Sequence, residues 1–121
     1  MAKKVLIVDD SASMRQMIAF TLERAGYEVA QGVNGRDGLV QLEKHNPQLI
    51  ISDLNMPEMD GFEFIRQLRA RAASRLTPVL MLTTESDGAK KQQGKAAGAT
   101  GWLVKPFQPE QLLLVIARVL P

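Results

Sequence analysis

Cysteine is absent from this 121-residue sequence, and histidine and tryptophan each occur once. The absence of cysteine excludes disulfides, thiolate metal sites and a cysteine nucleophile. A single histidine excludes zinc centres built from several histidines. The longest uninterrupted apolar run, Leu112 to Ala117, has six residues, whereas a membrane-spanning helix needs roughly 20. We therefore expect no disulfide scaffold, no histidine-rich zinc site and no membrane insertion.

A strong charge of either sign is also lacking. Fifteen lysines and arginines face thirteen aspartates and glutamates, and the net charge of +2 is too small to indicate nucleic-acid binding. With 45% hydrophobic and 23% charged residues, the composition is that of a globular protein. The length suits one domain, residues 1–121, with no output domain. The basic start is followed by an apolar run that Asp9 interrupts, so we expect no secretion signal and a cytoplasmic protein.

Short apolar runs without alternation predict strands that are buried on both faces. Three such runs span Lys4 to Val8, Leu49 to Ser52 and Pro78 to Leu82. Two weaker candidates are Glu28 to Gln31 and Trp102 to Val104. Continuous apolar strands are typical of a parallel sheet that is covered by helices on both sides.

Helical patterns alternate with these strands. They cover about Met14 to Ala25, Asn34 to Asn46, Asp60 to Ala72, Ser86 to Ala97 and Pro109 to Leu120. Five strand–helix units with short connections predict a doubly wound parallel α/β sheet with right-handed crossovers. Ligands bind such sheets beyond the carboxyl ends of the strands.

Polar residues stand at these carboxyl ends. Asp9 and Asp10 end the first strand, Asp53 the third, Thr83 and Thr84 the fourth, and Lys105 the fifth. Three converging carboxylates repel one another by about 3 kcal/mol per pair at about 5 Å and an effective dielectric constant of 20. Such a group must bind a proton or a cation. Oxygen ligands without histidine or cysteine select a hard ion, and Mg²⁺ fits best beside an incoming phosphate.

A carboxylate in this setting can attack phosphorus. Asp53 lies on the central strand and is the best nucleophile, while Mg²⁺ and Lys105 would neutralise the transferring phosphoryl group. The hydroxyl of Thr83 can donate a hydrogen bond to a phosphoryl oxygen. Each of these residues alone has a common structural explanation, but their arrangement at one edge favours phosphoryl transfer.

Four segments of the sequence resemble one family. They are Val5-Leu-Ile-Val-Asp-Asp10, Ser52-Asp-Leu-Asn-Met-Pro-Glu-Met-Asp-Gly61, Leu82-Thr-Thr84 and Gly98-Ala-Thr-Gly-Trp-Leu-Val-Lys-Pro-Phe107. In type, order and spacing they resemble the receiver domain of two-component response regulators, and within it the CheY-like single-domain subfamily. The resemblance implies a flavodoxin-like (βα)5 fold with strand order 2-1-3-4-5.

The resemblance also assigns roles at the acidic edge. It implies that Asp53 is the phosphoacceptor and that Asp10, Asp53 and the main-chain carbonyl of Asn55 bind Mg²⁺. Asp9 would support the metal through water, and Lys105 would bind the phosphoryl group. The Lys105-Pro106 bond is expected to be cis.

Further residues would govern the switch and the lifetime of the phosphoryl group. By resemblance, Thr83 is the switch hydroxyl, and Trp102 takes the place of a mobile aromatic that is usually Tyr or Phe. The larger indole puts complete inward rotation in question. Asn55 and Glu85 occupy positions that tune hydrolysis of the acyl phosphate.

The last two helices point to partners. The fourth helix contains Gly88 and Gly94, each costing roughly 1 kcal/mol relative to alanine, and we expect it to bury mostly alanines such as Ala89 and Ala96. A marginal helix is a candidate for a bistable element.

The last helix is apolar at eight of nine positions from Leu112 to Leu120. Some of Leu113, Leu114 and Val115 should therefore stay exposed and form a docking or dimerisation surface. The neighbouring lysines Lys90, Lys91 and Lys95 would suit an acidic partner.

The sequence thus predicts a phosphorylation-controlled switch. A histidine kinase would be the phosphodonor, and a downstream protein would dock on the fourth helix, fifth strand and fifth helix, in chemotaxis or another motility pathway. We expect a monomer or weak dimer that phosphorylates and dephosphorylates only itself.

Three alternatives remain at this point: a Mg²⁺-dependent phosphatase or phosphotransferase with an aspartyl intermediate, a flavin-binding module, and a receiver-like module that is never phosphorylated. The first lacks a second aspartate as general acid, because Asn55 stands there. The second lacks a glycine-rich phosphate loop after the first strand. The intact acidic set argues against the third.

Overall fold

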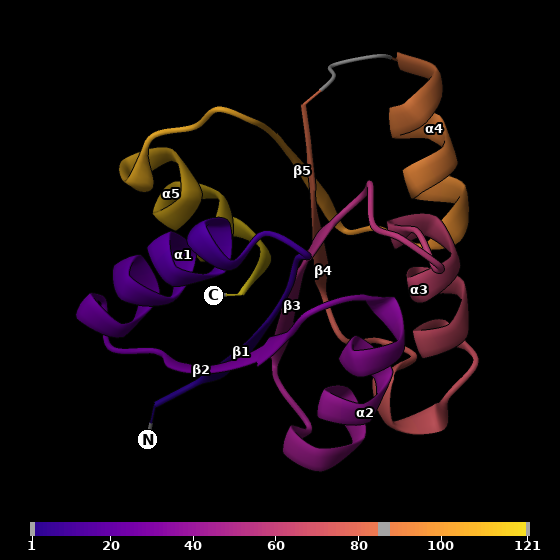
Figure 1. Ribbon diagram of the computed structural model, residues 1–121, viewed down its shortest axis with the longest axis horizontal. Coiled ribbons are helices and arrows are strands. Elements are labelled where there is room, and N and C mark those ends of the chain that lie inside the picture. The colour runs from indigo at the N-terminus through magenta and orange to yellow at the C-terminus, as the bar shows by residue number, and fades with distance from the viewer. Residues whose placement is uncertain (1, 85–87, 121) are drawn as a thin grey trace.

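The computed structural model describes residues 2–84 and 88–120, and no helix among them is long and apolar enough to cross a membrane. Five parallel strands form one sheet in the order β2-β1-β3-β4-β5, so the expected flavodoxin-like topology is confirmed (Figure 1). The strands are β1 (Lys4–Val8), β2 (Glu28–Gly32), β3 (Leu49–Asp53), β4 (Val79–Thr83) and β5 (Gly101–Val104). The helices are α1 (Ala12–Arg24), α2 (Gly35–His45), α3 (Gly61–Arg69), α4 (Gly88–Ala97) and α5 (Pro109–Val119).

Helices cover both faces of the sheet, which explains the unbroken apolar strands. Helices α1 and α5 lie on one side, and α2, α3 and α4 lie on the other (Figure 1). Within β1, Val5 and Ile7 pack into the core on the α1 and α5 side, whereas Leu6 and Val8 pack into the core on the opposite side. Side chains alternate along a strand, so both sets must be apolar.

Side-chain caps begin three of the helices. The side chains of Ser11, Asn34 and Asp60 accept hydrogen bonds from the backbone N–H three residues later, at the starts of α1, α2 and α3. The sequence predicts the caps at Asn34 and Asp60. Such caps satisfy N–H groups that have no partner inside the helix, and each contributes about 1 kcal/mol.

Several element ends differ from the sequence expectation. Strands β3 and β4 each extend one residue further, so Asp53 and Thr83 belong to the ladder, opposite Leu82 and Val104. Helix α3 ends at Arg69, and Ala72 belongs to a separate 3-10 turn, η1 (Ala72–Ser74). The expected start of the fourth helix at Ser86 lies outside the described residues.

The expected burial of α4 by alanines is wrong at Ala96, which is exposed; Gly94 and Ala97 are buried instead. Residues 94 and 97 are three apart and therefore share one helix face, whereas residue 96 points elsewhere. The side chain of Ala89 lies outside the described part of the structure.

Arg69 joins two connections at the amino-terminal edge of the sheet, a role that no sequence pattern signals. Its Nε and Nη2 donate to the main-chain carbonyl of Gly98 at 3.2 and 2.7 Å, and its Nη1 donates to the carbonyl of Ser74 at 3.0 Å. Burial lowers the pKa of the Arg69 guanidinium from its ordinary value, but arginine remains charged at neutral pH. The side chain thus ties α3 to the connections before β4 and β5.

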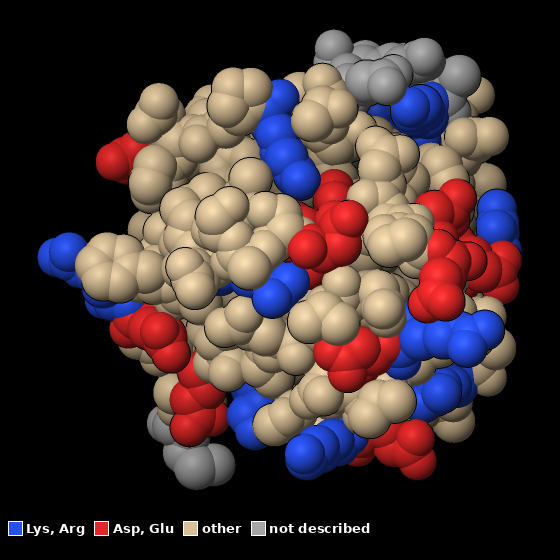
Figure 2. All heavy atoms as spheres, in the orientation of Figure 1, with Lys and Arg blue, Asp and Glu red and all other residues tan. Residues whose placement is uncertain are grey.

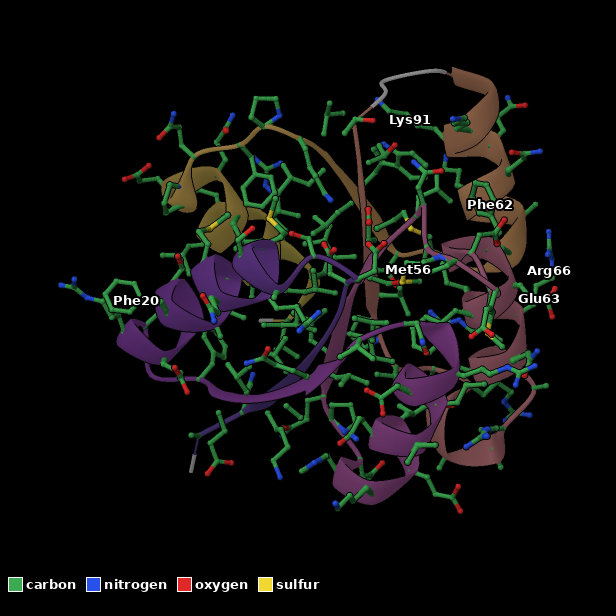
Figure 3. The ribbon with its side chains drawn as sticks, viewed as in Figure 1. Phe20, Met56, Phe62, Glu63, Arg66 and Lys91 are labelled. Atoms are coloured by element: carbon green, nitrogen blue, oxygen red, sulfur yellow. The ribbon has the colours of Figure 1, made fainter. Side chains whose placement is uncertain are left out.

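We predict that Arg69→Met lowers the free energy of unfolding by about 2 kcal/mol, because the carbonyls it serves lose a charged donor. Chemical denaturation measures the change. Arg66→Met is the matched control: Arg66 pairs with Glu63 at 3.2 Å on the exposed side of α3 (Figure 3), and exposed pairs contribute about 0–1 kcal/mol. Equal losses in the two variants would contradict the role of Arg69.

Candidate functional site

Three aspartates meet at the carboxyl edge of the sheet. Asp9 and Asp10 follow β1, Asp53 ends the adjacent strand β3, and one carboxylate oxygen from each lies within 4.8 Å of the others. Asp9 and Asp53 are 0% and 7% exposed, whereas Asp10 is exposed. Acidic atoms are visible near the centre of the face shown in Figure 2, with basic atoms close by. The convergence that strand order predicts is therefore present in the structure.

A lysine from the end of β5 reaches this acidic group. The Nζ of Lys105 lies 3.1 Å from Oδ1 of Asp53 and 3.4 Å from Oδ2 of Asp9, and its side chain is largely buried. The peptide bond between Lys105 and Pro106 is cis, as the resemblance implies. One ammonium group thus contacts two buried carboxylates from neighbouring strands.

Backbone groups hold the two buried carboxylates in place. Oδ1 of Asp9 accepts a hydrogen bond from the N–H of Ser11 at 2.9 Å, and Oδ1 of Asp53 accepts one from the N–H of Leu54 at 2.9 Å. Each bond fixes the orientation of a carboxylate relative to the strand that carries it. Hydrogen bonds to a charged acceptor are roughly twice as strong as neutral ones.

Arg15 supports the site from α1, and the sequence interpretation missed it. Its Nη1 donates to the main-chain carbonyl of Asp9 at 2.6 Å, and its Nε donates to Oε1 of Gln31 on β2 at 3.3 Å. The only available signal was its position, one turn into the helix that follows the acidic pair. Such a signal does not distinguish it from a solvated arginine.

The pKa of Asp53 is raised above its ordinary value of 3.8, chiefly because burial disfavours the charged form and secondly because Asp9 repels it. The charge and hydrogen bond of Lys105, and the N–H of Leu54, act in the opposite direction. Because these favourable contacts do not fully offset burial and repulsion, the ionised site has a net electrostatic demand for another positive charge.

The donor set fits a hard divalent cation. All three candidate ligands are carboxylates, their oxygens lie within 4.8 Å of one another, and one of the three residues is open to solvent. Mg²⁺ is bound in proteins through one or two carboxylates while it keeps several waters. The residues present therefore suit Mg²⁺, as the sequence predicts.

The other predicted site residues have different surroundings. Thr83 is buried at the end of β4, the strand next to Asp53, and Asn55 is exposed in the loop after β3. Glu85 lies outside the described residues. The structure thus brings together the three aspartates and Lys105, with Thr83 on the neighbouring strand.

Trp102 lies on β5, opposite Met81 of β4, and packs against the core on the α2, α3 and α4 side. It lines a pocket of about 230 Å³ to which Lys91 and Lys95 of α4 also contribute. Among the described residues its indole Nε1 is buried without a hydrogen-bond partner. An unpaired buried donor costs about 1–3 kcal/mol.

Comparisons with known proteins point to one family. The family model described as the response regulator receiver domain matches residues 5–117. The transcriptional regulatory protein ResD of Bacillus subtilis is 38% identical over 97% of this chain and 48% of its own length. The phosphate regulon regulator PhoB of Escherichia coli is 32% identical over 99% of this chain and 52% of its own length. The chain spans about half the length of the curated relatives that it matches.

Solved structures agree with this result. The chemotaxis protein CheY4 of Vibrio cholerae is 55% identical, with a TM-score of 0.97 over 99% of this chain and 100% of that one. A putative response regulator from Chloroflexus aurantiacus is 34% identical, with a TM-score of 0.93 over 98% of each chain. At these identities the similarity extends beyond the fold to the sequence.

We predict that Asp53→Asn stabilises the metal-free protein at pH 7, raising the melting temperature by roughly 2–5 °C. The raised pKa of Asp53 means that its ionised form opposes folding, so stability falls as the pH rises through that pKa. Asparagine resembles the protonated form, and its advantage should shrink as the pH approaches 3.8. Thermal unfolding in EDTA between pH 4 and 8 measures the difference in melting temperature between the variant and the wild-type chain. A difference that stays the same in acid would contradict the prediction.

Proposed function

The chain belongs to the response regulator receiver family of two-component systems, and from that premise we propose that Asp53 accepts a phosphoryl group from the phosphohistidine of a sensor kinase. The observation that carries the proposal is the contact of Lys105 Nζ with Asp53 and Asp9, with Asp10 beside them. A buried carboxylate, a cation that faces it and two further acidic ligands are the parts that phosphoryl transfer requires.

In the proposed reaction, an ionised oxygen of Asp53 forms a bond to phosphorus while the bond from phosphorus to the histidine nitrogen breaks. The electron pair of the broken bond stays on the imidazole, which then takes up a proton. Lys105, already 3.1 Å from Asp53 Oδ1, contacts the phosphoryl oxygens and offsets their charge. Asp10, Asp53 and the carbonyl of Asn55 would hold Mg²⁺, with Asp9 acting through water, and the ion would supply further neutralisation of charge.

Water ends the signal by attacking phosphorus and returning Asp53 to the free carboxylate with release of phosphate. Asn55, which is exposed in the loop after β3, would set the rate of this step by its access to the incoming water, and by resemblance Glu85 would also tune it. The domain acts on its own acyl phosphate and turns over no external substrate.

The response would pass through Thr83 and Trp102. Trp102 pairs with Met81 across the β4–β5 ladder, and Thr83 lies two residues after Met81 on the same face of β4. A hydroxyl that moves toward the phosphoryl group therefore changes the space on the side of the sheet where the indole packs.

The signal would leave through α4, β5 and α5. Leu114 is 62% exposed, and Leu113 and Val115 are partly buried, as the apolar pattern of α5 predicts. Lys91 and Lys95 line the pocket beside Trp102. Exposed apolar side chains on α5 together with lysines on α4 would suit an acidic protein partner.

Chemotaxis or another motility pathway is the proposed setting, because the similar CheY4 structure is that of a chemotaxis protein. We propose a cytoplasmic protein that is a monomer or weak dimer and has no nucleic-acid partner of its own. The curated relatives are transcriptional regulators, but about half of each lies beyond the matched region, so we propose no transcriptional role for this chain.

We predict that acetyl phosphate with Mg²⁺ labels the chain once, that EDTA prevents labelling and that Asp53→Asn abolishes it. Lys105→Met should slow labelling at least tenfold (about 1.4 kcal/mol in the barrier), because the phosphoryl group loses its cation. Intact-mass spectrometry measures the product. Asp60→Asn is the control, since asparagine also caps α3 at this position.

Labelling that survives in Asp53→Asn would contradict the assignment of the phosphoacceptor. Release of many phosphates per chain from phosphate esters would instead favour a phosphatase.

We also predict that Leu114→Asp abolishes the motility response in the source organism while labelling by acetyl phosphate is unchanged. A charge at the centre of the docking surface opposes apolar contact with the partner. Leu76→Asp is the control, because Leu76 is 87% exposed but lies in the connection before β4, at the amino-terminal edge of the sheet. A normal response with Leu114→Asp would contradict the proposed surface.

A further inference from the structure

Helix α4 has a gap where the indole of Trp102 meets it. A Cβ atom at Gly94 would lie 2.6 Å from Cζ3 and 3.2 Å from Cε3 of Trp102. The first distance is shorter than real Cβ contacts allow, so no side chain fits at residue 94 while the indole keeps its position. We call this gap the α4 notch. It is bounded by Gly94 and occupied by the six-membered ring of the Trp102 indole.

Backbone conformation does not explain the glycine. Gly26 and Gly98 have φ values of +95° and +109°, where a side chain is strained, but Gly94 lies inside α4 and has no such φ. In a helix interior, glycine is less favourable than alanine. The reason for glycine at residue 94 is therefore the space that Trp102 requires.

We propose that Gly94 is a positioning residue for Trp102: the α4 notch holds the indole in the resting conformation, and the indole leaves the notch when the site is activated. This inference rests on the proposed function, because activation means binding of a phosphoryl group at Asp53. It adds a determinant on α4 to the Thr83 and Trp102 switch.

Two observations indicate that the indole in the notch has another position to adopt. Its Nε1 is buried without a partner among residues 2–84 and 88–120, so this position leaves a donor unsatisfied. The pocket of about 230 Å³ beside α4 and β5 is lined by Trp102 itself. Because the donor has no partner here and there is space beside the ring, moving the indole of Trp102 out of the α4 notch costs little free energy.

The geometry of the sheet connects the notch to the site. Trp102 and Met81 are paired in the β4–β5 ladder, and Thr83 points to the same side of the sheet as Met81. A change at Thr83 therefore acts on the layer where the indole sits between β5 and Gly94. A side chain at residue 94 would fill the notch from the α4 side. It should favour the activated state, because it destabilises only the resting position of the indole.

A thermal cycle tests the notch without reference to phosphorylation. We expect Gly94→Ala to lower the melting temperature of the chain with Trp102 and to raise it in the Trp102→Phe background, where the second ring is gone and alanine only improves the helix. Trp102→Ala serves as a second background. Ala96→Gly, at an exposed position of α4, is the control and should lower the melting temperature equally in all backgrounds.

Gly94→Ala changes the melting temperature in the Trp102 chain and in the Trp102→Phe background. A difference of at least about 4 °C between these two changes supports the notch, and a smaller difference overturns it. This outcome does not depend on whether Asp53 is phosphorylated.

The functional part uses beryllofluoride with Mg²⁺, an analogue of the acyl phosphate. We expect Gly94→Ala to bind it with at least threefold higher affinity than the wild-type chain, measured by calorimetry. The emission of Trp102, the sole tryptophan, should already be shifted in the free variant toward that of the bound wild-type chain. Unchanged or weaker binding overturns the coupling. Failure of the wild-type chain to bind beryllofluoride would instead refute the proposed function, and the thermal cycle would still decide the notch.

Discussion

The sharing of one lysine by two buried carboxylates is the interaction on which the rest of the structure depends. Asp9 and Asp53 are brought together by neighbouring parallel strands, and burial and mutual repulsion raise the pKa of Asp53. Lys105 comes from the far edge of the sheet and offsets only part of this cost. A site built in this way favours an additional cation and changes its charge balance when one carboxylate is esterified. Electrostatic imbalance, rather than shape, is what favours a further cation at this edge of the sheet.

The elements around the site differ in how firmly they are held. The buried carboxylates are fixed by backbone N–H groups and, for Asp9, by the contact of Arg15 with its carbonyl. Helix α4 has weaker support, because a glycine occupies its buried face where it meets the indole of Trp102, whose donor has no partner among the described residues. Under the proposed function, a fixed acidic edge beside a weakly held helix would let a small change at Thr83 produce a larger change at the surface. Low local stability is expected of elements that move.

The surface on which this change would be read combines exposed Leu114 with lysines that line the pocket beside Trp102. In the curated relatives, about half of the protein lies beyond the region that this chain matches. The chain itself resembles the CheY4 structure over the full length of both. Under the proposed function, the domain would signal by presenting a different surface to another protein, and the side chains of α4, β5 and α5 would carry the specificity.

The sequence by itself determined the alternation of strands and helices, the parallel sheet and the meeting of Asp9, Asp10, Asp53 and Lys105 at one edge. These features follow from local periodicity and from the topology of a parallel sheet, which places all carboxyl ends together. The resemblance added strand order and roles for individual residues.

Tertiary structure alone decided the contacts between residues distant in the chain. The carbonyls bound by Arg69, the support of Asp9 by Arg15 and the space that Gly94 leaves for Trp102 are examples. In the sequence, Arg69 resembles any arginine at a helix end, and Gly94 resembles a weak point in a helix. Their functions depend on which groups lie opposite them after folding, and local sequence patterns do not contain that information.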